Sequence, residues 1–95
     1  MAEVTFALNP DQSRYELLDG EQVIGFSQYR DHDGVREVFH TEVDAAWAGQ
    51  GLATRLLEYV LADIRAAGLV LVATCPLLRA YLRKHPEQRD LLAPR

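Results

Sequence analysis

Residues 43–55 read VDAAWAGQGLATR, and the fold of the chain is best deduced outward from this segment. An alternating, strand-like run ends at Val43, Gly49 and Gly51 follow, and leucines then recur at helical spacing. The first amides of a helix have no partner inside the helix and lie at the positive end of its dipole. Glycines beside them let a ligand approach the backbone closely. This junction is therefore a candidate phosphate-binding site.

Other phosphate-binding loops fit the segment less well. A Walker-A loop requires Gly-Lys-Ser/Thr, and the segment contains no lysine. A dinucleotide-binding fingerprint requires a third glycine where Thr54 stands, and an acidic residue about twenty positions later. The two glycines alone are equally consistent with an ordinary helix N-terminus, so both interpretations remain open at this point.

The residues before the loop have the pattern of an antiparallel meander. Asp19-Gly20 and Asp33-Gly34 are tight-turn signals between runs that favour strands. The strand-like runs cover residues 4–8, 15–18, 21–29 and 35–43. In the last run, a period of two predicts one shared face for Val35, Glu37, Phe39, Thr41 and Val43.

A helix, a buried strand and a second helix are expected after the loop. Apolar residues repeat at helical spacing over residues 52–64, and Gly68 suits a helix C-terminus. A short apolar run then favours a strand, and a second helix fits between Pro76 and Pro86. The order β-β-β-β-α-β-α predicts a single α+β domain, residues 1–95, whose helices pack against a mainly antiparallel sheet.

Composition narrows the class of protein. The 95 residues are 48% hydrophobic and 25% charged, as in one globular domain. A net charge of −4 argues against a nucleic-acid partner, and no apolar run is long enough to span a membrane. The absence of a signal-peptide pattern and the single cysteine predict a cytoplasmic location.

Charge is distributed unevenly along the chain. Residues 1–49 hold three Arg against ten Asp or Glu, whereas residues 50–95 hold seven Lys or Arg against four. This asymmetry suits a site that joins a cationic substrate to an anionic cofactor, and it is also consistent with chance distribution on a solvated surface.

The loop resembles the phosphate-binding motif of the GNAT acetyltransferase superfamily, Arg/Gln-x-x-Gly-x-Gly/Ala. Gly51 and Ala53 match that motif, and Ala48 replaces the usual Arg or Gln. An ordered set of motifs over roughly residues 14–92 also resembles the small YjdJ-type GNAT-like proteins. The set is His40-Thr41-Glu42-Val43, Gly49-Gln50-Gly51-Leu52-Ala53, Cys75-Pro76, Tyr81 and His85-Pro86.

The resemblance implies a minimal GNAT-like acyl-CoA N-acyltransferase fold with acetyl-CoA as cosubstrate. Its pyrophosphate is expected on the amides of residues 49–54, with the pantetheine beside the strand that ends at Val43. Arg55 either contacts the phosphates or is a solvated helix residue. The expected cofactor-binding residues are Val43, Gly49, Gln50, Gly51, Leu52, Ala53, Thr54 and Arg55. No metal is expected, because neither His32 nor His85 has a metal-ligand pattern around it.

Four residues are candidates for the chemistry of acetyl transfer. Period two places His40 and Glu42 on one strand face with Cα atoms ~7 Å apart. Either is suited to accept a proton from the amine, directly or through water, and an ordinary half-exposed strand face is the alternative. Cys75 is expected at the end of the last strand, where it either accepts the acetyl group or lines the acetyl pocket. Tyr81 stands where larger GNAT enzymes have a tyrosine suited to protonating the leaving thiolate, and a core aromatic residue is the alternative.

These observations predict an N-acetyltransferase acting on an unknown amine acceptor, which is a small molecule or a protein lysine or N-terminus. One alternative is a coenzyme-A-binding module with little or no turnover, and another is a structural domain that keeps only the fold. A basic cluster near the C-terminus is either a solvated helix face or a contact for the 3′-phosphate of the coenzyme. Its members are Arg79, Arg83, Lys84 and Arg89.

Overall fold

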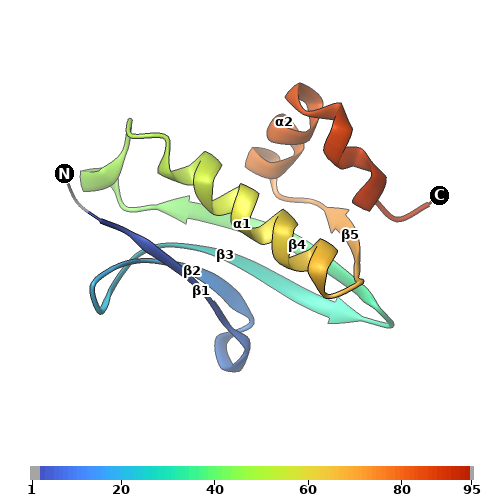
Figure 1. Cartoon of the computed structure of the whole chain (residues 1–95), viewed down its shortest axis with the longest axis horizontal. Coiled ribbons are helices and arrows are strands. Elements are labelled where there is room, and N and C mark those ends of the chain that lie inside the picture. The colour runs from blue at the N-terminus through green and yellow to red at the C-terminus, as the bar shows by residue number, and fades with distance from the viewer. Residues whose placement is uncertain (1–2, 95) are drawn as a thin grey trace.

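Five strands form one sheet in chain order, with two helices on one of its faces (Figure 1). The computed structural model describes residues 3–94. The strands are β1 (Thr5–Asn9), β2 (Arg14–Asp19), β3 (Gln22–His32), β4 (Val35–Val43) and β5 (Val70–Ala73). The helices are α1 (Leu52–Ala66) and α2 (Pro76–Lys84), and the short 3₁₀ helices are η1 (Pro10–Gln12), η2 (Ala45–Trp47) and η3 (Pro86–Leu91). The predicted order of strands and α-helices is confirmed.

The first four strands form an antiparallel meander, and β5 pairs with β4 in parallel after the crossover through α1. The prediction of an α+β fold with a mainly antiparallel sheet is therefore confirmed. The parallel pairing is short, because it runs only from Val35 opposite Val70 to Val38 opposite Ala73. Beyond Val38, β4 is paired with β3 alone among the described strands.

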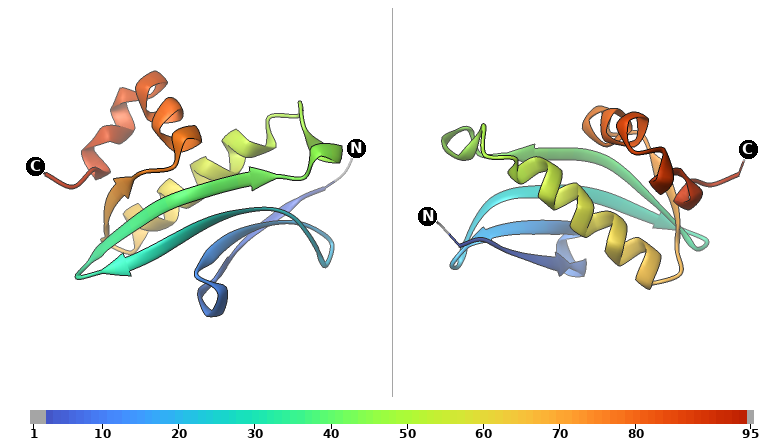
Figure 2. Two further views of the ribbon diagram at one scale, coloured as in Figure 1. Left: turned by 180° about the vertical axis from the view of Figure 1, so that it is seen from behind. Right: turned by 45° about the horizontal axis from the view of Figure 1, so that its top comes forward.

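The hydrophobic core lies between the sheet and the two helices. An apolar stripe on α1 provides much of it, because residues three and four apart lie on one helix face. The buried residues of this stripe are Leu52, Leu56, Leu57, Val60, Leu61 and Ile64. The opposite face of the sheet has no helix over it in residues 3–94 (Figure 2). No helix within this part of the chain has the length and apolar character needed to cross a bilayer.

A β-bulge in β4 changes which side chains face the helices. Phe39 is the extra residue, because its neighbours Val38 and His40 pair with consecutive residues of β3. The alternation of faces shifts by one at this point. Thr41 consequently hydrogen-bonds to Ser27, which is fully buried on the helix-facing side. The single face predicted for the whole strand is therefore wrong beyond Phe39.

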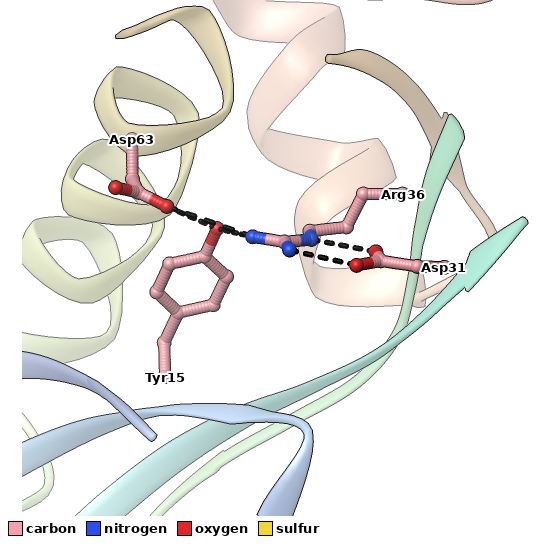
Figure 3. A network of polar contacts seen from close by, with 4 residues as sticks. All are labelled: Tyr15, Asp31, Arg36 and Asp63. Atoms are coloured by element: carbon pink, nitrogen blue, oxygen red, sulfur yellow. Dashed lines mark hydrogen bonds and ion pairs between the residues drawn. The ribbon is translucent and has the colours of Figure 1, made fainter. Parts of the chain in front are cut away.

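A polar network centred on Arg36 joins three strands to α1 (Figure 3). The Arg36 side chain, on a residue only 8% exposed, donates two hydrogen bonds to Asp31, at 2.7 and 2.8 Å, and one to the Tyr15 hydroxyl at 2.7 Å. Tyr15 in turn donates to Asp63 of α1 at 2.8 Å, and the guanidinium lies 3.9 Å from the centre of the Tyr29 ring. The hydrogen bonds from Arg36 hold the pKa of Asp31 below its usual value, whereas burial raises the pKa of Tyr15.

Candidate active site

The glycine loop leaves β4 through the short helix η2. Asp44 begins this turn, because its amide donates to the carbonyl of Ile24 at 2.7 Å and its carboxylate accepts from the Ala46 amide at 3.1 Å. Trp47 is partly buried and packs against the core. These contacts fix the direction in which the chain travels from the end of the strand to the start of α1.

Both glycines of the loop adopt left-handed backbone conformations. The φ angles are 83° at Gly49 and 74° at Gly51, a region that glycine enters without steric cost. Gly51 is the N-cap of α1, and no side chain within residues 3–94 caps this end of the helix. A Cβ atom on either glycine would meet nothing within 4 Å in the described part of the chain. The first amides of α1 and the open space over the glycines together fit the oxygen atoms of a phosphate group.

Most of the predicted cofactor-binding residues can bind a phosphate only through their backbone amides, because they have no polar side chain. Leu52 is the clearest case, because its side chain is buried in the core and its amide remains at the helix start. Gln50 and Thr54 are exposed, while Val43 and Ala53 are half-buried. This distribution is consistent with a site that depends on backbone amides, which the sequence pattern also indicated.

Arg55 is directed toward β1. Its guanidinium lies 5.4 Å from the centre of the Phe6 ring, which itself stacks on Tyr59 of α1. The side chain is exposed, and the four rotatable bonds along its stem allow it to move. To contact a phosphate at the loop, the guanidinium would move away from the Phe6 ring. Contact between Arg55 and a phosphate stays a prediction.

The second half of β4 has an open edge on the side of β5. The carbonyl of Val38 accepts the amides of both Thr74 and Cys75 at 3.1 Å, and the chain then leaves the sheet to begin α2. Backbone amides alternate in direction along a strand, and the Asp44 amide points toward β3. The amide of Val43 therefore faces the open edge, which leads directly into the glycine loop.

His40 and Glu42 lie together on the face of the sheet that has no helix. Nε2 of His40 is 2.8 Å from Oε1 of Glu42, and both side chains are about half exposed. The imidazole also lies beside Phe26 of β3, with ring centroids 5.9 Å apart. When Nε2 carries the proton that Glu42 accepts, Nδ1 is left as a proton acceptor.

Cys75 lies on the other face of the sheet and is only 1% exposed. Its thiol donates to Oγ1 of Thr41 at 3.4 Å, and that oxygen is 2.8 Å from the hydroxyl of Ser27. Sequence reasoning missed this chain of three polar side chains, because the β-bulge that turns Thr41 inward has no signal in the alternating pattern.

Tyr81 is also on the helix-bearing side, where it bridges the two helices. Its hydroxyl donates to Oε2 of Glu58 in α1 at 3.3 Å, and its ring stacks on His85 with centroids 4.1 Å apart. Burial, followed by the charge of Glu58, raises the pKa of the Tyr81 hydroxyl above its usual value. Glu58 was missed by sequence reasoning, since an exposed Glu on an amphipathic helix is ordinary.

The structure thus divides the predicted catalytic residues into two groups. His40 and Glu42 form one pair, while Cys75 and Tyr81 lie across the sheet from them. Within residues 3–94 no hydrogen bond links the two groups. The same part of the chain places no three His, Cys, Asp or Glu side chains where they would hold a metal ion.

Comparison with known proteins assigns the family. The model of the GCN5-related N-acetyl-transferases matches residues 14–91, which include strands β2 to β5, the glycine loop and both α-helices but not β1. The chain belongs to the GCN5-related N-acetyltransferase (GNAT) family. The resemblance to this family is confirmed, and the YjdJ-type subgroup stays a prediction. A comparison with curated proteins gives no significant match.

Solved structures share the GNAT fold of this chain. A GCN5-like protein from Staphylococcus aureus, an inferred N-acetyltransferase, is 23% identical over 100% of this chain and 93% of its own, with a TM-score of 0.74. Ard1 from Thermoplasma volcanium is 15% identical, with a TM-score of 0.61 over 78% of this chain and 55% of that one. An inferred GNAT acetyltransferase from Desulfovibrio desulfuricans is 18% identical, with a TM-score of 0.56 over 78% and 52%. The matched part of this chain spans about half the length of the last two proteins.

The burial of Cys75 in this GNAT domain gives a testable expectation. We expect Cys75→Ser to lower acetyl transfer by less than about tenfold, because a hydroxyl keeps the hydrogen bond to Thr41 and a buried thiol is a poor nucleophile. Single-turnover assays with intact-protein mass spectrometry measure both the rate and any acetyl adduct. An adduct on Cys75 that forms and decays at the turnover rate would establish the covalent route instead.

Proposed function

We propose that this chain is an N-acetyltransferase that binds acetyl-CoA along the open edge of β4 and transfers its acetyl group to an amine. The observation that carries the proposal is that the open edge of β4 continues directly into the start of α1. Within residues 3–94, the second half of β4 is unpaired on the β5 side and leads straight to the uncapped amides of α1, beneath the open space over Gly49 and Gly51. This combination of a strand edge and an anion site suits an elongated ligand whose pantetheine arm is joined to a pyrophosphate.

The backbone supplies most of the binding in this proposal. Amides at the start of α1 hold the pyrophosphate, and the Val43 amide at the open edge is available to the pantetheine. Bound acetyl-CoA supplies an activated acyl group. Cys75, buried under the point where β4 and β5 separate, lines the acetyl end of the site.

Two side chains are assigned to proton transfer. His40 accepts the proton that the amine loses, and the carboxylate of Glu42 at 2.8 Å orients the imidazole. Tyr81 gives a proton to the departing thiolate, since a tyrosine hydroxyl is protonated at neutral pH, and it regains the proton from solvent. His40 and Tyr81 lie on opposite faces of the sheet. The amine therefore loses its proton on one face, and the leaving thiolate receives its proton from the other.

Calorimetric titration with acetyl-CoA tests the proposal first. Binding in the micromolar to millimolar range is expected, followed by acetyl transfer to at least one member of a panel of peptides, polyamines and amino acids. Absence of coenzyme binding would reject the proposal. Binding without transfer to any acceptor would favour a coenzyme-A-binding module instead.

His40→Gln is expected to lower turnover by ~10²-fold or more, the usual contribution of a general base, with little change in affinity for acetyl-CoA. His32→Gln is the matched control, because the His32 side chain is 88% exposed beside a turn and is placed in neither group of candidate residues. Full turnover in the His40 variant would transfer the role to Glu42 or to water.

A further inference from the structure

A groove of about 660 Å³ runs between α2, the outer edge of β5 and the C-terminal segment. Figure 1 shows this region at the end of the molecule away from the glycine loop, where the orange and red segments meet. The apolar part of the lining comes from Leu71, Leu82 and Leu92. Three arginines line it as well, and they are Arg79, Arg83 and Arg89.

These arginines lack carboxylate partners in the described part of the chain, because no ion pair involving any of them is formed within residues 3–94. The nearest acidic residues of η3 are engaged elsewhere. Glu87 lies 3.2 Å from His85, and Asp90 accepts two hydrogen bonds from Arg65 at 2.7 and 2.9 Å. In a chain of net charge −4, three uncompensated arginines around one groove are a local positive field that attracts an anion.

The outer edge of β5, on the side away from β4, is already paired at Leu71 with the extended C-terminal segment. Leu92 forms a parallel bridge with Leu71, and the Ala93 amide donates to the Leu71 carbonyl at 2.8 Å. The backbone geometry at this edge is therefore suited to β-augmentation, in which main-chain hydrogen bonds hold an added strand. The groove continues along β5 from this bridge to Thr74, the residue before Cys75.

We propose that the groove binds an extended, acidic peptide segment of the acceptor, with its carboxylates on Arg79, Arg83 and Arg89. The proposal rests on the proposed function in one respect, namely that the amine to be acetylated belongs to the same polypeptide. Acceptor selection then depends on acidic residues flanking the amine. The arginines of the basic cluster accordingly serve the acceptor rather than the 3′-phosphate of the coenzyme.

Binding of a fluorescent peptide of about eight residues, rich in Asp and Glu around one lysine, tests this without acetyl-CoA. Wild-type protein should bind it more tightly than a peptide with Gln and Asn in place of the acids. Arg83→Gln should weaken binding by about tenfold, the scale of one charge-assisted hydrogen bond. Lys84→Gln removes the same charge from the next residue, which does not line the groove, and should change affinity less than twofold.

Three outcomes would overturn the proposal. These are equal affinity for the acidic and neutral peptides, equal weakening by the Arg83 and Lys84 variants, and displacement of the peptide by inorganic phosphate at comparable concentration. Because this assay contains no coenzyme, its failure leaves the acetyl-CoA titration untouched. Conversely, peptide binding by a chain that fails to bind acetyl-CoA rejects the proposed function alone and keeps the groove as a peptide site.

Discussion

We expect the Ala53→Glu variant to lose measurable affinity for acetyl-CoA while remaining fully folded. Ala53 is the second residue of α1 and is only half-buried, so a longer side chain can extend beside the uncapped amides. An acidic residue in the first turn stabilises a helix, which protects the fold. The same carboxylate occupies the anion site and repels the pyrophosphate, so calorimetry should detect at least a hundredfold loss of affinity.

Ala62→Glu provides the matched control for this variant. It makes the same change of size and charge on an exposed position of the same helix, far from the glycine loop. Substitution of Gly51 is a less clear test, because its φ of 74° strains any other residue and confuses binding with stability. Equal coenzyme affinity in the Ala53 and Ala62 variants would show that the phosphate binds elsewhere.

Arg36→Met is expected to lower the free energy of unfolding by about 3 kcal/mol, because it removes several hydrogen bonds of a buried guanidinium, although Asp31 itself is about half exposed. The variant loses the hydrogen bonds to Asp31 and Tyr15 and the contact with the Tyr29 ring. For a domain of this size, Tm should fall by about 12–24 °C. Thermal and urea unfolding, followed by circular dichroism, measure both quantities.

Arg30→Met is the control, because Arg30 makes similar contacts with Glu37 and the Phe39 ring on an exposed surface. Its effect should stay below about 1 kcal/mol. The two variants should also differ in how their free energy of unfolding depends on pH in the acidic range. The depressed pKa of Asp31 means that its stabilisation is present above about pH 4 and is lost as pH falls through the folded value. Arg36→Met should remove this part of the acid dependence, and an unchanged acid profile would contradict the role given to the network.

Much of the fold was predictable because its signals are local. Two Asp-Gly turns fix the hairpins, and the change of period after Gly51 fixes the start of α1. The loop was the most informative segment for the site, since helix-start amides and glycine conformations depend on near neighbours in sequence. The pairing of His40 with Glu42 followed from strand period two alone.

What the sequence did not reveal depends on contacts between distant residues. The bulge at Phe39 turns Thr41 toward Cys75, although nothing in the alternating pattern marks the extra residue. Arg36 resembles any strand-surface arginine until the fold brings Asp63 of α1 close to it. The inserted residue changes the face on which Thr41 lies, and the distant carboxylate gives Arg36 a partner that its own strand does not supply.

The brief parallel pairing of β4 with β5 has a consequence for how the molecule folds and opens. Strands β1 to β4 pair with immediate chain neighbours, whereas β5 reaches β4 only after the whole crossover through α1. Ordering that long connection has the largest loop-closure cost in the chain, and it is offset by only four residue pairs in the sheet. We therefore expect the pairing of β4 with β5 to form late during folding and to open early during fluctuations, which hydrogen exchange of the β5 amides would measure. A ligand bound between β4 and β5 would stabilise the weakest strand pairing of the sheet. Its binding should therefore raise the free energy of unfolding of α2 and the C-terminal segment.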